Sequence, residues 1–163
     1  TQGNYLVQLF RQHAAGKLPG LLGRTDLRQC YAFIDDVAEG VVAALDRAPA
    51  GSGYVLGGEN ATVDDLFAAF RHETGIRPPR LRIPYGVAAV LGRLQRMRAD
   101  WFGKEPELTD DVVEVYRHEW AYSSARAERE LDYRVTSLAD GVRRTVAWMR
   151  ESGVLGARPA GDA

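Results

Sequence analysis

The stretch of sequence that decides the fold spans residues 30–45 and reads CYAFIDDVAEGVVAAL. It opens with a short apolar and aromatic run over residues 30–34, which predicts a buried strand. Asp35 or Asp36 follows at the position of a helix N-cap, where a carboxylate accepts a backbone N–H. The apolar residues beyond this cap recur at helical spacing, so we expect a helix with the inner stripe Val37, Val41, Val42 and Leu45.

Two more short strands are expected on the C-terminal side of this stretch. Residues 54–56 form a strand pattern that Gly57 and Gly58 stop, and residues 81–83 form another. The strands at 30–34 and 54–56 are continuously apolar, which is typical of strands covered on both faces. Strands this short do not make a stable sheet on their own. We therefore expect them to join a sheet that another segment builds.

Helix start and stop signals explain most of the remaining chain. Thr62 and Asp65 make a capping box, and Gly75 ends the helix that they open, whose inner face is Val63, Leu66, Phe67 and Phe70. Other helices are expected over residues 4–15, after Pro84, from Thr109, from Ser123 to near Leu131, and from Ser137 to Gly153. The predicted fold class is α/β and helix-rich, with roughly two or three short strands and about six helices.

The composition narrows the class of protein. The chain has 163 residues, and its 21 basic and 22 acidic side chains give a formal net charge of -1. This length is sufficient for a domain with its own core. There is no basic excess to bind a phosphate backbone, and no apolar run approaches the roughly 20 residues of a membrane span. Neither nucleic acid nor a membrane is therefore expected as a partner.

Single residues give hints about the setting of the chain. Cys30 is the only cysteine, which excludes an internal disulfide and fits the reducing cytoplasm. Lys17 and Lys104 are the only lysines, and this arginine bias is typical of a GC-rich bacterial coding sequence. The chain starts with Thr1 rather than Met. Together with strands that need another segment, this leads us to expect a piece of a longer protein.

The local motifs contain no complete active site. A dinucleotide-binding loop needs closely spaced glycines between a strand and a helix. Gly57 and Gly58 lack a third glycine, and Gly16, Gly20 and Gly23 have the wrong spacing. No tyrosine has a lysine four positions later, and the 3 histidines are not at metal-ligand spacing. We assign no catalytic, cofactor-binding or metal-binding residue to this chain.

Four segments, taken together and in order, resemble a known family. They are residues 31–40 (YAFIDDVAEG), 54–62 (YVLGGENAT), 126–133 (RAERELDY) and the closing helix over 137–153. This ordered set resembles the second half of the extended short-chain dehydrogenases/reductases, the NAD-dependent epimerase/dehydratase family. Within that family it is most similar to the dihydroflavonol-reductase-like branch.

The resemblance implies that the chain is the C-terminal part of a Rossmann-type protein. Residues 1–155 would be the substrate-binding portion and residues 156–163 a flexible tail. The glycine loop and a catalytic Tyr/Lys pair would belong to an N-terminal dinucleotide-binding half that is absent here. NAD or NADP would bind the complete protein, and none is expected for this chain alone. The implied partners are the Rossmann half, in the same or a separate chain, a small-molecule or sugar-derivative substrate, and a second copy of the protein.

The chain departs from the family at positions that contact nucleotide sugars. Such members often have an Arg-Asp pair before the strand, whose arginine holds a phosphate with two hydrogen bonds. Gln29 and Cys30 occupy the matching positions, with Arg28 one residue out of register. A later Arg-x-x-Asp contact falls on Val113 and Tyr116. These departures favour the reductase-like branch or a diverged protein.

The leading hypothesis is the substrate-domain portion of an NAD(P)-dependent oxidoreductase or epimerase-like protein, acting on a hydroxyl or keto carbon and inactive alone. One alternative is a stand-alone, non-catalytic binding or oligomerisation module derived from that family. Another is a half-enzyme completed by a separately encoded Rossmann half. Trp120 lines a pocket or packs against other residues. The candidate substrate-binding residues are Arg28, Gln29, Tyr31, Arg82 and Trp101.

Overall fold

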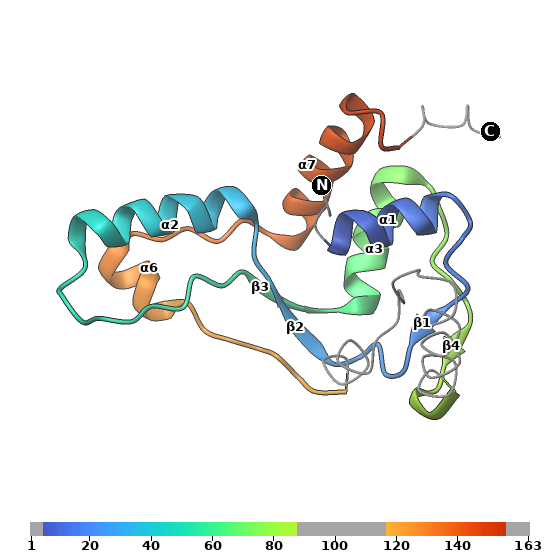
Figure 1. Ribbon diagram of the computed structural model, residues 1–163, viewed down its shortest axis with the longest axis horizontal. Coiled ribbons are helices and arrows are strands. Elements are labelled where there is room, and N and C mark those ends of the chain that lie inside the picture. The colour runs from blue at the N-terminus through green and yellow to red at the C-terminus, as the bar shows by residue number, and fades with distance from the viewer. Residues whose placement is uncertain (1–4, 88–116, 156–163) are drawn as a thin grey trace, which may run out of the picture.

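Helices and very short strands alternate along the chain (Figure 1). The computed structural model describes residues 5–87 and 117–155. The fold is α/β and helix-rich, as predicted. Its elements are α1 (Tyr5–Ala14), β1 (Leu21–Leu22), β2 (Arg28–Tyr31), α2 (Ile34–Arg47), β3 (Glu59–Thr62), α3 (Val63–Thr74), β4 (Arg82–Ile83), α6 (Ala125–Leu131) and α7 (Leu138–Glu151).

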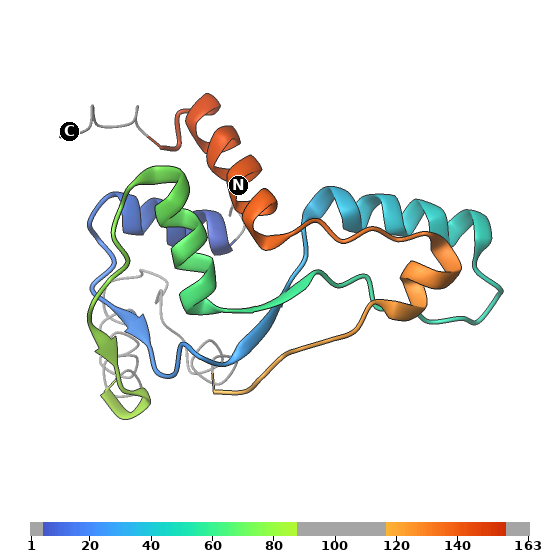
Figure 2. The same ribbon diagram turned by 180° about the vertical axis from the view of Figure 1, so that it is seen from behind.

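The antiparallel pair of β2 and β3 lies between two groups of helices. Arg28 pairs with Thr62 at one end of the ladder, and Tyr31 pairs with Glu59 at the other. Because α2 follows β2 and α3 follows β3, the two helices start from opposite ends of the pair. As a result α2 and α6 lie together at one end of the molecule, and α1, α3 and α7 lie at the other (Figures 1 and 2). β1 and β4 form a separate parallel pair.

The strand predictions are wrong in position. The strand expected over residues 30–34 is β2, Arg28–Tyr31, because the chain has already entered α2 at Ile34. Residues 54–56 form no strand, and the strand in this region is β3, Glu59–Thr62. β2 is only partly buried rather than covered on both faces. β1 was not predicted, whereas β4 lies within the strand expected over residues 81–83.

Side chains explain why residues 54–58 do not pair as a strand. Gly57 N–H donates to Ser124 Oγ at 3.0 Å, and Gly57 C=O accepts from the Tyr133 hydroxyl at 2.9 Å. Gly58 N–H donates to Cys30 Sγ at 3.2 Å. A side chain at Gly58 would collide with the backbone of Tyr31. The two glycines therefore allow this segment to cross β2 in close contact.

The predicted N-cap of α2 is also wrong, and that of α6 is displaced by one residue. The N-cap of α2 is Phe33, which makes no side-chain cap hydrogen bond. The Asp36 carboxylate instead accepts from the Thr136 backbone N–H at 2.6 Å and from its hydroxyl at 2.7 Å. The N-cap of α6 is Ser124, whose hydroxyl accepts from the Gly57 N–H and makes no cap hydrogen bond. The predicted Ser123 lies one position earlier, and its hydroxyl accepts from the Ala125 N–H at 3.3 Å. The side chains of Asp36 and Ser124 are therefore held by segments distant in sequence.

The caps of α3 and α7 are as predicted. Thr62 and Asp65 form a complete capping box, with reciprocal hydrogen bonds of 3.1 Å and 3.0 Å. Gly75 ends α3 in the left-handed conformation with φ 78°. The Ser137 hydroxyl accepts from Asp140 N–H at the start of α7. These caps join residues three positions apart, so neighbouring sequence specifies them.

The main core lies between α1, α3 and α7. The rings of Phe10 and Phe70 stack with centroids 4.3 Å apart. The predicted inner face of α3 is buried, and α7 contributes a matching stripe. The buried apolar residues of this core are Phe10, Leu66, Phe70, Val142, Val146, Met149 and Leu155.

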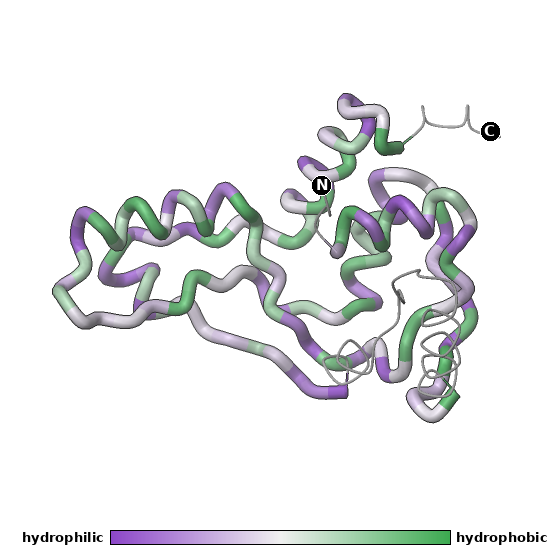
Figure 3. Tube along the Cα trace, viewed as in Figure 1, coloured by the Kyte–Doolittle hydropathy of each residue, from purple (hydrophilic) through white to green (hydrophobic). Residues whose placement is uncertain are grey.

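The predicted inner stripe of α2 is wrong. Val42 and Leu45 are 58% and 82% exposed, and green apolar positions mark α2 in Figure 3. The side of α2 that packs against α6 consists of small residues, Gly40, Ala43 and Ala44. A Cβ at Gly40 would press on the Tyr133 ring, so close packing requires the small residue and turns the larger ones outward.

Several expectations fall on residues that the structure does not describe. They are most of the helix after Pro84, of which residues 85–87 are helical, the helix from Thr109, the tail over 156–163, and Trp101. Within residues 5–87 and 117–155, every helix is too short or too polar to cross a membrane.

We expect Gly58→Ala to lower the free energy of unfolding by about 2 kcal/mol, because the added methyl group forces β2 and residues 54–58 apart. Gly53→Ala is the matched control, since a Cβ there meets open space; it should change stability by less than about 1 kcal/mol. Urea unfolding followed by circular dichroism measures both. Equal effects of the two substitutions would contradict the close crossing.

His13 predicts a pH dependence of stability. Its ring lies 5.1 Å from Phe67 and 5.7 Å from Phe70, and its Nε2 is buried without a hydrogen-bond partner. Burial lowers the pKa of His13 below its usual value of 6.5, opposed in part by a hydrogen bond to the Arg77 backbone. The unfolded chain therefore takes up a proton first as the pH falls.

We expect the free energy of unfolding to decrease as the pH is lowered below about 6.5. His13→Phe, which cannot be protonated, should reduce this dependence. His72→Gln is the control because the His72 side chain is 85% exposed. Urea unfolding at a series of pH values measures the slope. A slope that His13→Phe leaves unchanged would show that His13 does not titrate in this way.

Candidate functional site

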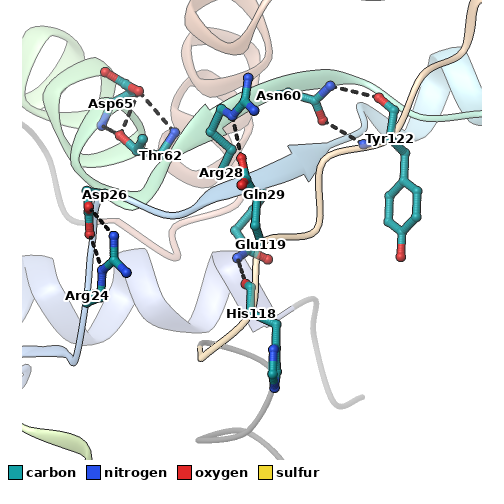
Figure 4. A network of polar contacts seen from close by, with 10 residues as sticks. All are labelled: Arg24, Asp26, Arg28, Gln29, Asn60, Thr62, Asp65, His118, Glu119 and Tyr122. Carbon is teal, nitrogen blue, oxygen red and sulfur yellow. Dashed lines mark hydrogen bonds and ion pairs between the residues drawn. The ribbon is translucent and has the colours of Figure 1, made fainter.

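Arg28 and Gln29 lie where the segment over residues 118–122 runs along β2 (Figure 4). The Trp120 backbone N–H donates to Arg28 C=O at 2.9 Å. Arg28 forms an ion pair with Glu119. The Gln29 amide donates to the backbone carbonyl of His118 at 3.1 Å. Two of the predicted site residues therefore lie side by side and hold this segment.

Asn60 attaches the same segment to β3. Its side-chain N–H donates to Tyr122 C=O at 2.7 Å, and its side-chain oxygen accepts from Tyr122 N–H at 3.1 Å (Figure 4). An amide side chain can make this double contact because it carries the same donor and acceptor as a peptide group. The backbone at Tyr122 is therefore fixed relative to both strands.

Arg82, in β4, lies beside the first turn of α3, in a second polar group. Its guanidinium donates to Asp64 at 2.6 Å, and the Thr25 hydroxyl donates to the other oxygen of Asp64 at 2.7 Å. The nearby Arg24 pairs with Asp26 at 2.8 Å. Contacts through Asp64 and Thr25 therefore hold Arg82 beside the loop that leads into β2.

Three arginines around β2 and the start of α3 form ion pairs. Hydrogen bonds from the Thr62 hydroxyl and backbone N–H keep the pKa of Asp65 below its usual range, so this carboxylate stays ionised at neutral pH. The guanidinium of Arg117 lies over the Tyr85 ring, 5.9 Å from its centroid. The guanidiniums of Arg24, Arg28 and Arg82 pair with the carboxylates of Asp26, Glu119 and Asp64.

Tyr31 faces a different feature of the molecule. It lines an open apolar groove of about 700 Å³ between α1, the junction of β2 with α2, and α7. Burial, with a smaller contribution from the negative charge of Asp65, raises the pKa of Tyr31 to about 12. The phenol is therefore protonated at neutral pH and acts as a hydrogen-bond donor or a packing surface rather than as a base.

Three aromatic rings follow one another along the 118–122 segment. The His118 and Trp120 ring centroids are 6.4 Å apart, and those of Trp120 and Tyr122 are 6.5 Å apart. Trp120 is 39% exposed and Tyr122 is 47% exposed. The structure thus gives Trp120 a place beside Gln29, on a partly exposed surface rather than in the core.

The structure brings together some of the predicted residues and adds others. Arg28 and Gln29 are adjacent in β2, Arg82 of β4 contacts the first turn of α3, and Tyr31 faces the groove. Trp101 lies outside the described residues. Glu119, Asn60 and Asp64 also contact these residues or the 118–122 segment, and none of them was among the predicted site residues. The alternation His-x-Trp-x-Tyr over residues 118–122 was a signal for a one-sided extended segment, but nothing local identifies Asn60.

The described residues offer neither a metal site nor a dinucleotide loop. Over residues 5–87 and 117–155, no three His, Cys, Asp or Glu side chains are grouped for a metal ion. Gly57 and Gly58 bring the backbone close to Cys30 and Tyr31 of this same chain. Their small size therefore allows this segment to pack closely against β2.

Comparison with known sequences finds relatives that are longer than this chain, and no family model matches. The uncharacterized protein YbjS of Escherichia coli is 29% identical over 114 residues, covering 69% of this chain and 34% of its own length. A putative dihydroflavonol 4-reductase of Synechocystis is 24% identical over 94% of this chain and 44% of its own length. Sterol demethylase protein B of Methylococcus capsulatus is 28% identical over 84% of this chain and 46% of its own length. The chain thus spans between about a third and about half of these relatives.

Comparison with solved structures finds the same fold. The gox2253 structure matches with a TM-score of 0.71 and 28% identity, over 95% of this chain and 46% of that one. A UDP-glucuronic acid 4-epimerase from Bacillus cereus in complex with NAD matches with a TM-score of 0.61 and 19% identity. The match covers 91% of this chain and 40% of that one. A nucleoside-diphosphate-sugar epimerase from Pseudomonas aeruginosa matches with a TM-score of 0.65 and 19% identity. The match covers 91% of this chain and 43% of that one. At 19% identity these two epimerases show the fold alone.

The aligned part of the epimerases is their C-terminal half. This agrees with the order of the sequence segments, which also place the chain in that half. Nearly all of the chain takes part in each structural match, whereas less than half of each neighbour does. The resemblance to the C-terminal half of an NAD-dependent epimerase/dehydratase family protein, the extended short-chain dehydrogenases/reductases, is therefore confirmed.

Proposed function

We propose that residues 1–155 are the substrate-binding portion of a cytoplasmic NAD(P)-dependent oxidoreductase or epimerase-like protein. The complete protein would act on a hydroxyl or keto carbon of a small molecule or sugar derivative. This chain alone would be inactive. The observation that carries the proposal is an apolar face of α2 left exposed in a chain that covers less than half of its relatives.

The exposed face of α2, which we call the α2 stripe, consists of Ile34, Val41, Val42 and Leu45. These side chains are 70%, 48%, 58% and 82% exposed. A contiguous apolar patch is a feature of a surface that another protein part covers. The nearby segment over residues 54–58 is extended without being part of a strand, and its Val55 is also exposed. We propose that a Rossmann half, in the same or a separate chain, packs against both.

The proposed cofactor, NAD or NADP, would bind that other half. When bound, its nicotinamide would donate or accept a hydride at the substrate carbon. The residues of this chain would contribute the substrate side of the site. Arg28, Gln29 and Arg82 are held in place by their partners Glu119, His118 and Asp64, and are proposed to contact the substrate. Tyr31, protonated at neutral pH, would position groups rather than remove a proton.

The first test is to read the coding frame that precedes Thr1 in the source DNA. We expect an in-frame strand followed by closely spaced glycines, and a Tyr-x-x-x-Lys pair further on. An unrelated frame would remove the same-chain form of the proposal. In that case co-purification of the tagged chain from its source cells would test for a separately encoded Rossmann half. Reduction of a carbonyl by the isolated chain with NADPH would contradict its proposed inactivity.

The α2 stripe gives a test that depends on packing. In the longer protein, Leu45→Ser should lower the free energy of unfolding by about 2 kcal/mol or more, because the stripe is buried there. In the isolated chain the same substitution should change it by less than about 0.5 kcal/mol, because Leu45 is 82% exposed. Glu39→Ser, at an exposed polar position of α2, is the control in both.

Urea unfolding of the two proteins and their variants gives these values, and analytical ultracentrifugation gives the assembly state. A stable dimer of the isolated chain that Leu45→Ser dissociates would favour the alternative, a stand-alone oligomerisation module. The stripe would then serve a second copy of the chain rather than a Rossmann half.

A further inference from the structure

An apolar groove lies open beside the core of α1, α3 and α7. It has a volume of about 700 Å³ and lies between α1, the junction of β2 with α2, and α7. Leu6 and Val7 of α1 line it together with Leu138 and Trp148 of α7. Trp148 is 52% exposed although its side chain is large and apolar. Removing such a lining from water is favourable, so the groove favours an apolar occupant.

The groove continues the apolar surface of the α2 stripe. Ile34, which is 70% exposed, belongs to the stripe and also lines the groove. It is the first residue of α2, so the stripe reaches the groove at the junction with β2. A protein part that covers the stripe therefore meets the edge of the groove.

The N-terminal end of α1 lies at the groove. α1 begins at Tyr5, and Leu6 and Val7 in its first turn line the groove. In the two epimerases the aligned part is the C-terminal half, so most of their remaining length precedes the position that matches Thr1. Polypeptide that leads into α1 in a longer protein therefore arrives beside the groove.

The polar groups of the groove suit a peptide segment rather than a charged ligand. The Arg144 guanidinium lies over the Phe33 ring, 5.4 Å from its centroid, and Asp35 also lines the groove. One positive and one negative group leave no excess charge to attract an ion. The Tyr31 phenol is protonated at neutral pH and can donate to a carbonyl oxygen. A peptide offers both apolar side chains and backbone carbonyls.

We propose that the polypeptide directly preceding Thr1 in the longer protein crosses this groove and packs apolar side chains against Tyr31, Phe33 and Trp148. The inference rests on the proposed function, because it assigns one surface of this chain to the longer protein. The connection between the two halves is then packed between α1 and α7 rather than exposed as a linker. The body of the Rossmann half covers the α2 stripe.

Hydroxyl-radical footprinting read by mass spectrometry tests this in three proteins. They are this chain, the chain lengthened by the residues encoded directly before Thr1, and the complete protein. About 20 added residues are enough, since they span up to roughly 60 Å when extended. We expect Trp148 to be oxidised at least about fivefold more slowly in the lengthened chain and in the complete protein than in this chain, because the segment covers it.

Leu45 and His72 are the reference side chains. Leu45, in the α2 stripe, should be protected only in the complete protein, because the added segment reaches the groove and not the far end of α2. The His72 side chain is 85% exposed on α3 and should react equally in all three proteins. Leu45 thus reports on the proposed function, and Trp148 reports on the segment in the groove.

Two variants of the lengthened chain connect the protection to the groove. Trp148→Glu places a charge among apolar side chains and should expel the segment, which returns the oxidation rate of Phe33 to within about twofold of its rate in this chain. Ala147→Glu, at an exposed position of α7 outside the groove, is the matched control and should keep Phe33 protected. Circular dichroism checks that both variants are folded, and the comparison of the three unsubstituted proteins does not depend on them.

Each failure has its own meaning. An unchanged Trp148 rate in the complete protein would overturn the inference, and protection of Leu45 there would leave the proposed function standing. Protection of Trp148 in the complete protein but not in the lengthened chain would also overturn it, because another part would then cover the groove. Protection that disappears on dilution would assign the groove to a second copy instead.

The upstream coding frame separates the two proposals further. An unrelated frame before Thr1 would overturn this inference and keep the separate-chain form of the proposed function. Protection of Trp148 by a segment whose frame lacks the glycine loop would keep the inference and remove the same-chain form of that function.

Discussion

The antiparallel register of β2 and β3 is the constraint on which the rest of the structure depends. Pairing of Arg28 with Thr62 places the N-cap of α3 at one end of the ladder, and pairing of Tyr31 with Glu59 places the start of α2 near the other. The two helix groups therefore extend in opposite directions from one short pair of strands (Figure 1). A change in register would shift the two helix groups relative to one another, since each helix follows its strand without a long linker.

The same strand pair assembles the candidate site. β2 supplies Arg28 and Gln29, β3 supplies Asn60, and all three bind the segment over residues 118–122. The close crossing of Gly57 and Gly58 over β2 places the Ser124 hydroxyl within reach of Gly57. These glycines thus allow the backbone to pack closely against β2. The result is a partly exposed aromatic segment in a region of paired charges.

Two surfaces of the chain suit different roles. The α2 stripe is apolar and exposed because the small residues Gly40, Ala43 and Ala44 take the packed side of the helix. It is the kind of surface that another folded part covers. The aromatic segment instead combines exposed rings with polar neighbours, which is typical of a small-molecule site. This division agrees with a substrate-binding portion that depends on a second half for its chemistry.

The amino-acid sequence by itself determined α3 and α7, because their caps join residues three positions apart and their apolar stripes recur at helical spacing. It also carried the resemblance to the C-terminal half of the family. The position of β3, the exposure of the α2 stripe and the pairing of Arg28 with Glu119 were decided by the tertiary structure. Each of these depends on residues distant in sequence: Asn60 pairs with Cys30, Gly40 contacts Tyr133, and Arg28 meets a carboxylate 91 positions away. Local spacing carries no information about such partners, since the chain brings them together only when it folds.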